Sequence, residues 1–292
     1  MRGCMRTNEL DIVIEPVHDH RGYRECEALQ KAVWGFEDIA VVPDHILHTV
    51  VEGGGLLLGA YDGIGPGREM VGFVLSLLGR WEDGRLRHQS LMAAVRPDWQ
   101  GRGVGYALKC AQREHVLSQG IELITWTFDP LESRNSHFNL NKLGAVATRY
   151  MPNYYGEFRD ARNRGLASDR FLCEWHLTAP RTRARLGGRA PELALGKAET
   201  INRTRRLASG LRAPAGFRAD LAAPLLLYEI PHDLQALKRQ DLDLAREWRM
   251  ESRRALSLYF EDGYLATGLF HQGDRSFLIL ERASRSEVLA RP

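Results

Sequence analysis

The sequence predicts a layered protein of the α/β (α+β) class, with a mixed, mostly antiparallel sheet flanked by helices and a C-terminal βαββ region. The first observation behind this prediction is that short apolar, β-branched runs alternate with stretches of helical period. The second is that turn residues separate neighbouring runs, as in residues 62–67. The third is a glycine-rich loop at residues 100–105, which joins a strand to a helix.

The elements of the first 178 residues follow in chain order from these patterns. The apolar runs on either side of residues 62–67 predict a β-hairpin. Gly120 and Gly144 follow helical patterns, and we expect each to end a helix. The predicted strands lie at residues 11–14, 56–61, 70–78, 87–95, 121–128, 145–150 and 170–177, and the predicted helices at 18–34, 43–52, 104–118 and 131–143.

Residues 179–224 differ in composition from the rest of the chain. Nine arginines and Lys197 stand against only Glu192, Glu199 and Asp220, with little hydrophobic periodicity. We interpret this stretch as a polar connector between residues 1–178 and 225–292. A surface for anionic ligands or nucleic acid is the alternative.

The C-terminal residues 225–292 repeat an order of elements found earlier. Strands at 225–230, 263–271 and 276–281 and a helix at 233–260 repeat the strand-helix-strand-strand order of residues 121–177. We interpret them as a degenerate second half-domain, the alternative being a generic βαββ appendage. Because a half-sheet leaves an uncovered edge, it should pack on the first domain or on a partner subunit.

Composition excludes several classes of protein. A chain of 292 residues with 44% hydrophobic and 26% charged residues is typical of a globular protein, and a net charge of +3 does not indicate a polyanionic partner. No apolar run approaches the roughly 20 residues that cross a bilayer, and residues 1–10 lack the apolar core of a secretion signal. Cys4, Cys26, Cys110 and Cys173 form no CxxC pair. We therefore expect a cytoplasmic protein without a metal site or membrane partner.

The glycine-rich loop carries the strongest chemical signal. A strand ends at Val95, and a helix begins near Gly105. A turn of this kind points backbone N–H groups at one place beside the positive end of the helix dipole, as a diphosphate requires. Tyr106 and Ala107 stand where a Walker A loop needs Lys and Ser or Thr. The GxGxG register and long entry also differ from the Rossmann fingerprint.

Ser90-Leu91-Met92-Ala93-Ala94-Val95-Arg96-Pro97-Asp98-Trp99, running into Gln100-Gly101-Arg102-Gly103-Val104-Gly105-Tyr106, closely resembles motif A of the GNAT superfamily of N-acetyltransferases. That motif reads (Gln/Arg)-x-x-Gly-x-(Gly/Ala) after a strand that ends in Val-x-Pro. The order of elements from residue 10 to 177 is similar to the GNAT fold as well. The chain is therefore identified as a two-part, bacterial-type member of this superfamily, with an acyltransferase domain at residues 1–178.

The resemblance implies the cofactor and the reaction. Acetyl-CoA or another acyl-CoA would donate an acetyl, succinyl or other small acyl group to a primary amine of a small metabolite or amino acid, which attacks the thioester directly. In the family the strand before the loop bends at a bulge, and its backbone pairs with the pantetheine arm and polarises the thioester carbonyl. The residues that this assigns to coenzyme A are Ala93, Ala94, Val95, Gln100, Gly101, Arg102, Gly103, Val104, Gly105, Tyr106 and, on the later helix, Asn135.

The proton-transfer groups depart from the family pattern. Asn139-Leu140-Asn141-Lys142-Leu143-Gly144 resembles the family's Leu-Tyr-x-Lys-Leu-Gly, but the usual general acid, Tyr, falls on Leu140. The Glu that serves some members as base falls on Gln89. The candidates that remain are His88, Asp129 and, on the following helix, His137 as bases, and Tyr150, Tyr154 and Tyr155 as acids.

Two other interpretations stay open. The substitutions at Gln89 and Leu140 are compatible with a catalytically weak CoA-binding regulatory module. A nucleic-acid-binding protein that uses the arginine-rich stretch is less favoured. The sequence is also compatible with a homodimer.

Overall fold

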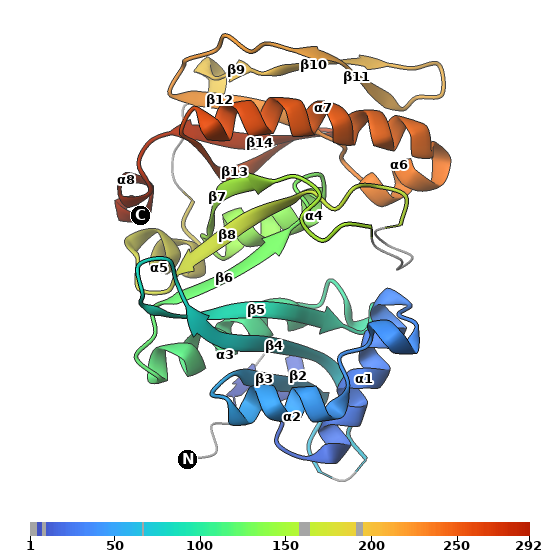
Figure 1. Ribbon diagram of the computed structural model, residues 1–292, viewed down its shortest axis with the longest axis vertical. Coiled ribbons are helices and arrows are strands. Elements are labelled where there is room, and N and C mark those ends of the chain that lie inside the picture. The colour runs from blue at the N-terminus through green and yellow to red at the C-terminus, as the bar shows by residue number, and fades with distance from the viewer. Residues whose placement is uncertain (1–4, 8–9, 66, 158–163, 191–194) are drawn as a thin grey trace. The chain divides into compact units, whose positions relative to one another are not determined.

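The structure is a computed structural model that describes residues 5–7, 10–65, 67–157, 164–190 and 195–292. Glu192 and the first four residues, which entered the sequence analysis, lie outside the described residues. The chain divides into two compact units, residues 1–126 and 127–292, and each is described here by itself (Figure 1). None of the described helices is both long enough and apolar enough to span a membrane.

The first unit is built on a sheet in which the strands lie in chain order from β1 to β6. Neighbours from β1 to β5 pair antiparallel, and β5 pairs with β6 in parallel. The strands are β1 (Met5–Thr7), β2 (Leu10–Pro16), β3 (Leu56–Asp62), β4 (Met70–Arg80), β5 (Leu86–Val95) and β6 (Leu123–Phe128), the last of which runs into the second unit.

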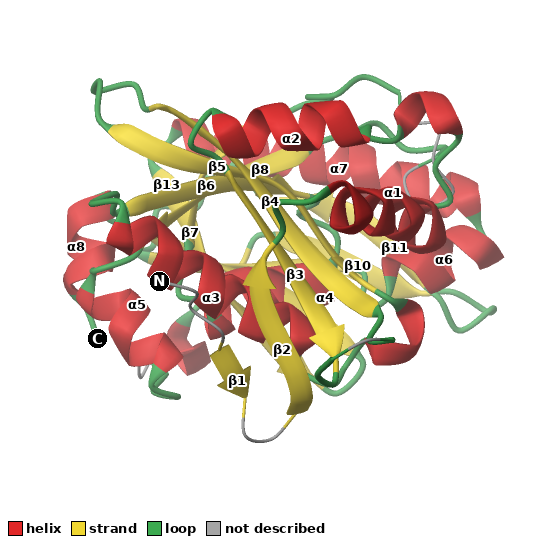
Figure 2. Cartoon of the chain, turned by 90° about the horizontal axis from the view of Figure 1, so that it is seen from below, coloured by secondary structure: helices red, strands yellow, loops and turns green. Residues whose placement is uncertain are grey.

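Helices cover both faces of this sheet (Figure 2). Alternation along β3 sends Leu56 and Leu58 to one face, where they pack with α3 (Val104–Ser118), and Leu57 to the other, where α1 (His20–Trp34) and α2 (Asp44–Glu52) cover it. Asp19 is the N-cap of α1, because its carboxylate accepts a hydrogen bond from the N–H of Gly22 at 2.7 Å. Short 3₁₀ turns lie at Asp38–Ala40 and Pro97–Trp99.

The second unit holds a sheet with the order β8-β7-β13-β14-β12-β9. Only β12 and β9 pair in parallel; the other neighbours pair antiparallel. The strands are β7 (Val146–Met151), β8 (Arg170–His176), β9 (Glu199–Thr200), β12 (Leu225–Ile230), β13 (Tyr264–Gln272) and β14 (Arg275–Arg282). The helices are α4 (Ser133–Ser136), α5 (Pro180–Leu186), α6 (Leu234–Gln240), α7 (Leu242–Glu261) and α8 (Arg285–Ala290).

The predicted fold class is confirmed: the protein is a mixed α/β structure with a mostly antiparallel sheet flanked by helices. Two predicted helices differ from the structure. The helix expected at 131–143 is the single turn α4 continued by a π-helix, His137–Lys142. The helix expected at 233–260 is interrupted at Asp241, whose extended backbone ends α6 and whose carboxylate caps α7 by accepting from Leu244 N at 2.9 Å.

Where the sequence suggested a connector, the described residues 179–190 and 195–224 are folded. They contain α5, a 3₁₀ turn (Leu195–Lys197), β9 and a ribbon of β10 (Asn202–Arg206) and β11 (Arg212–Phe217). Polar side chains are among the groups that attach the ribbon to the rest of the unit. The Asn202 amide donates to Glu229 O at 2.9 Å and accepts from Glu229 N at 2.8 Å, as a neighbouring strand would.

The same sequence of elements occurs twice in the second half of the chain. Strand-helix-strand-strand-helix describes β6 to α5 and again β12 to α8. The two hairpins, β7–β8 and β13–β14, are joined because β7 pairs antiparallel with β13 at Ala147 and Ala266. These alanines occupy equivalent places, each three residues after the glycine that follows the helix. Strands β7 and β13 thus pair at equivalent positions of the two hairpins.

The equivalence extends to side chains. Thr148 is the bulged residue of β7 and Thr267 that of β13. The Thr148 hydroxyl donates to buried Glu174 at 2.8 Å, and the Thr267 hydroxyl donates to buried Glu281 at 2.6 Å. The same bulge, donor and acceptor therefore recur in both hairpins.

Replacing either hydroxyl, in Thr148→Val or Thr267→Val, leaves a buried carboxylate with one donor fewer. We expect each change to lower the free energy of unfolding by about 1–3 kcal/mol, measured by urea denaturation. Ser209→Ala, in the exposed turn between β10 and β11, should change it by about 0.5 kcal/mol or less. Equal stability of all three variants would contradict a contribution from the repeated bond.

Candidate functional site

Strand β5 is irregular where the sequence predicts the cofactor. Its pairing with β4 shifts between Ser90 and Met92, so that Leu91 is the extra residue of a β-bulge. Its parallel pairing with β6 is confined to His88 and Gln89. The two strands therefore share only the beginning of β5, and the edge beyond Gln89 is open on the β6 side.

The backbone on this open edge can be assigned from the ladder. Arg96 N donates to Val71 O at 2.8 Å, so the backbone of Arg96 faces β4. Ala94 precedes Arg96 by two residues and is opposite Phe73 of β4. Antiparallel ladders alternate, so the N–H and C=O groups of Ala94 face β4. Those of Ala93 and Val95 face the open edge, where the Gln100 side chain donates to Val95 O at 2.9 Å. Ala93 thus presents a donor and an acceptor, and Val95 presents a donor.

The loop after β5 has the backbone that its glycines predict. Gly101 and Gly103 have φ values of 79° and 92°, which a residue with a Cβ adopts only with strain. Gly103 precedes α3 without a side-chain cap. The first intrahelical bond runs from Ala107 N to Gly103 O at 3.0 Å, so the preceding N–H groups have no helical acceptor. Gly105, by contrast, is an ordinary helical residue.

The entry to the loop is braced by charge. Arg96 donates to Asp98 at 2.8 Å and to Glu69 at 2.7 Å. Its guanidinium and that of Arg102 lie 6.0 and 5.1 Å from the ring centre of Trp99. These contacts fix the approach to the glycines and leave the Arg102 side chain exposed beside them.

Lys109 is a residue of this region that the sequence analysis missed. It lies on α3, only 4% exposed, with Nζ 2.6 Å from Gln112 Oε1 and 3.2 Å from Ser90 Oγ. The same nitrogen is 4.0 Å from the ring centre of Trp126 on β6. Lys109 thus connects α3 to both strands near the bulge. A lysine among the apolar positions of a helix was the available signal.

His88 is a buried structural residue rather than an open base. Its Nδ1 is 2.9 Å from Ser76 Oγ and its Nε2 is 2.7 Å from Gln119 Oε1, so both ring nitrogens are occupied. Burial lowers the pKa of the ring, which favours the neutral form. Strict alternation from Gln89 places the ring on the face covered by α3.

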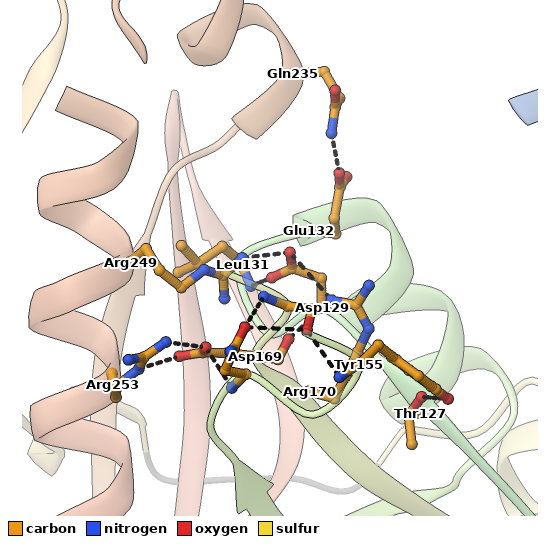
Figure 3. Close-up of polar contacts among 12 residues, drawn as sticks. Thr127, Asp129, Leu131, Glu132, Tyr155, Asp169, Arg170, Gln235, Arg249 and Arg253 are labelled. Carbon is orange, nitrogen blue, oxygen red and sulfur yellow. Dashed lines mark hydrogen bonds and ion pairs between the residues drawn. The ribbon is translucent and has the colours of Figure 1, made fainter. Parts of the chain in front are cut away.

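Tyr150 belongs to a buried network in the second unit. Its hydroxyl donates to Asp169 Oδ2 at 2.5 Å. Arg253 binds both oxygens of the same carboxylate at 2.6 and 3.0 Å (Figure 3). Burial and then the Asp169 charge raise the pKa of the Tyr150 phenol well above its usual range. Burial raises the pKa of Asp169, but the bonds from Arg253 and Tyr150 outweigh it and lower the pKa overall. Tyr150 is therefore held as a hydrogen-bond donor within the fold.

Asp129 follows β6 and is bound by cations. Its carboxylate accepts from Arg249 and from Leu131 N, the latter at 2.9 Å, and lies 3.7 Å from Arg170 (Figure 3). This arrangement makes Asp129 the anchor of two arginines. The sequence missed them because Arg170 and Arg249 are distant in the chain.

Tyr154 and Tyr155 form an exposed turn. Asn153, with φ of 45°, begins it, and Ser168 holds it through bonds from the N–H groups of both tyrosines. The Tyr155 hydroxyl lies 2.9 Å from Thr127 Oγ1, and the two tyrosine rings meet edge to face at 4.7 Å. Of the three predicted tyrosines, these two are accessible to a substrate.

The helix that carries the remaining predicted positions is short. Asn135 is exposed on α4. Leu140, where the family pattern has Tyr, is fully buried in the π-helix. The described residues of this helix therefore supply no phenol that could act as the general acid in place of Leu140.

Comparisons with known proteins find similarity only among solved structures. No protein-family model matches the sequence, and no curated protein matches it. The NatC complex bound to a Gag peptide and CoA is similar over 58% of this chain and 100% of that chain, with a TM-score of 0.45 and 17% identity. The ribosomal-protein-S18-alanine N-acetyltransferase from Escherichia coli is similar over 57% of this chain and 94% of that chain, with a TM-score of 0.44 and 14% identity. An acetyltransferase of the GNAT family from Streptococcus pneumoniae is similar over 56% of this chain and 97% of that chain, with a TM-score of 0.43 and 12% identity. Similarity of this degree carries no information on the substrate.

The lowered pKa of His88 predicts a direction for the effect of acid on stability. In the unfolded chain the ring has its ordinary pKa of about 6.5, and in the folded chain its pKa is lower. The folded state is therefore fully stabilised above about pH 6.5 and loses stability as the pH falls below that value. His88→Gln should reduce the decrease in urea midpoint between pH 7.5 and 5.5. An unchanged decrease would contradict the role of His88, and His45→Gln, at an exposed site, is the control.

Proposed function

We propose that this protein is a cytoplasmic acyl-CoA-dependent N-acyltransferase of the GNAT type. It transfers an acetyl, succinyl or other small acyl group to a primary amine of a small metabolite or amino acid. One observation carries the proposal: β5 presents unpaired backbone groups beyond its bulge, and the 3₁₀ turn Pro97–Trp99 leads from it to a loop with two left-handed glycines at the N-terminus of α3. This combination suits a ligand with an amide-containing arm and a diphosphate.

The chain offers matching groups for each part of such a ligand. The diphosphate suits the N–H groups from Arg102 to Gly105, because they lack helical acceptors and lie at the positive end of the α3 dipole. The amides of the pantetheine arm suit the donor and acceptor of Ala93. The Val95 N–H is a second donor on the same edge. Acyl-CoA supplies the acyl group activated as a thioester.

The reaction needs a proton to leave the acceptor and one to reach the thiolate. A neutral amine nitrogen forms the C–N bond, the C–S bond breaks, and the released thiolate takes up a proton. Backbone donors of β5 stabilise the oxyanion formed on the carbonyl. Since His88 and Tyr150 are occupied within the fold, we assign the acid to Tyr154 or Tyr155 and leave the amine proton to a water relay.

The catalytically weak coenzyme A-binding module is the second candidate. Buried Leu140 and the occupied ring of His88 favour it, because both remove groups that could transfer protons. This module would bind the same cofactor as the acyltransferase and would differ from it only in its rate of turnover.

Thiol release from acetyl-CoA and succinyl-CoA, measured against a panel of amines and amino acids, tests the proposal. We expect turnover with at least one pair. Saturable binding of coenzyme A without turnover would support the module, and absence of binding would contradict both candidates.

Gly103→Ala should weaken coenzyme A binding about tenfold or more, because alanine disfavours the φ of 92° and the loop backbone must change to relieve the strain. Isothermal titration calorimetry measures the change. Gly84→Ala, at φ of 83° in the turn between β4 and β5, bears the same backbone strain outside the loop and should bind normally. Equal affinity of both variants would remove the loop from the site.

A tyrosine-to-phenylalanine series separates the three phenols. Loss of a general acid typically costs 10²–10⁴-fold in turnover, so Tyr154→Phe or Tyr155→Phe should lower kcat by roughly that factor. Tyr150→Phe should instead lower the urea midpoint, because it removes a donor from buried Asp169. If kcat is unchanged in all three variants, no tyrosine among them is the acid.

A further inference from the structure

A polar pocket lies within the first unit, outside the residues that we assign to coenzyme A. The end of β2, the start of α1 and the turn between β3 and β4 form its wall, and its free volume is about 130 Å³. A single water needs roughly 10–15 Å³ of such volume. The pocket can therefore hold a small organic molecule.

Tyr61 of β3 provides an open polar group in the wall. Its ring packs on Gly59, where an added Cβ would lie 2.8 Å from a ring carbon, and the Arg68 guanidinium lies 4.2 Å from the ring centre. An added Cβ on Gly22, in the first turn of α1, would lie 3.5 Å from the Tyr61 hydroxyl. The side chain is 7% exposed, and no described residue forms a hydrogen bond with the hydroxyl. Because buried hydroxyls nearly always have a partner, this one is a group that a ligand would satisfy.

The wall carries more negative than positive charge. Its charged groups are the carboxylates of Glu15, Asp19 and Glu25 and the guanidinium groups of Arg21 and Arg68. Arg68 donates to Glu15, and Arg21 donates to Glu25 at 3.0 Å. Asp19 has no cationic partner among the described residues, and its carboxylate caps α1. With the imidazole of His18 counted as neutral, three carboxylates against two guanidinium groups leave a net charge of −1.

The negative charge acts at the open hydroxyl. Burial raises the pKa of the Tyr61 phenol well above its usual range, and the charges of Glu25 and Glu15 add to the rise. A place at which carboxylates oppose the loss of a proton favours a cation. No group of His, Cys, Asp and Glu among the described residues could hold a metal ion, whereas an ammonium group has three donors for the phenol oxygen and the carboxylates.

We propose that this pocket binds a small molecule through its primary ammonium group, which the Tyr61 hydroxyl and the carboxylates of Asp19 and Glu25 receive. The pocket is separate from the place of acyl transfer. Strand β4 lies between β3 and β5, so Tyr61 is two strand spacings, roughly 10 Å, from β5. The groups that we assign to the pantetheine arm lie on the far edge of β5. The ligand is therefore not the reacting acceptor, and the proposal does not rest on the proposed function.

The charge of the ligand is tested with ethanolamine, ethylene glycol and glycolate, which are similar in size and end in an ammonium, a hydroxyl and a carboxylate group. Saturation-transfer NMR measures their binding to the full-length chain at pH 7.5 and constant ionic strength, without acyl-CoA. We expect saturable binding of ethanolamine and about tenfold weaker binding, or none, of the other two. No saturable binding of ethanolamine, or equal affinity for either of the other probes, would overturn the proposal.

Tyr61→Phe removes the open hydroxyl and keeps the ring on Gly59. It should weaken ethanolamine binding about three- to tenfold, as loss of one hydrogen bond predicts. Tyr23→Phe removes the same atom from a buried tyrosine of α1 that is not part of the wall, and should bind as the parent does. Equal affinity of the two variants would contradict the role of Tyr61.

The carboxylates are tested at Glu25, because a change of Asp19 would also remove the cap of α1. Glu25→Gln should weaken ethanolamine binding about tenfold, and its partner Arg21 is exposed to solvent. Glu122→Gln is an equal loss of charge at an exposed residue outside the wall, and should leave the affinity unchanged. If Tyr61→Phe does not fold, this pair still decides the result, and equal losses in it would overturn the proposal.

The pocket and the cofactor site can fail independently. Coenzyme A affinity, measured by calorimetry, should be the same in the parent and in Glu25→Gln. Ethanolamine binding that depends on Glu25, without any binding of coenzyme A, would contradict the proposed function and leave the ammonium site standing. Coenzyme A binding without such ethanolamine binding would do the reverse.

Discussion

A β-strand has two edges that can form hydrogen bonds, and β5 satisfies only one of them along its second half. Strand β4 pairs with the whole length of β5, whereas β6 pairs only at His88 and Gln89. The bulge at Leu91 accompanies this departure, and the 3₁₀ turn Pro97–Trp99 leads from the end of the strand to the glycine loop. The features that we assign to the cofactor, the donor and acceptor of Ala93 and the N–H groups at the start of α3, depend on this half-open strand.

Buried charge organises the second unit in a comparable way. Asp169 joins Tyr150, Arg253 and the N–H of Asn153 at one carboxylate, so that β7, β8 and α7 meet in one arrangement. Removing either partner from such a group is costly, which makes the arrangement specific. The two threonine–glutamate bonds at the bulges of β7 and β13 serve the same purpose twice. Their recurrence supports the interpretation of the C-terminal residues as a second copy of a half-domain.

The site residues differ in how far the sequence could predict them. Gly101 and Gly103 were predictable, because glycine at a strand-to-helix turn has a local conformational cause. His88 and Tyr150 were ranked as catalytic candidates by residue type, yet their roles depend on Ser76, Gln119 and Asp169, which contact them only after folding. Arg249 gave no signal for the same reason: its carboxylate partner is 120 residues away.

The sequence by itself determined strands β2 to β6 and helices α1 to α3 of the first unit, the end of α3 near Gly120, and the glycine loop, because each depends on periodicity or on a local backbone preference. Tertiary structure decided the rest. In the arginine-rich stretch it formed the helix Pro180–Leu186 and the ribbon of β10 and β11. The sequence did not reveal the ribbon, because contacts such as the bonds of Asn202 to the backbone of Glu229 leave no periodic trace. It also decided which ionisable groups are occupied and which are open, because burial and charge pairing bring together residues that are remote in the chain.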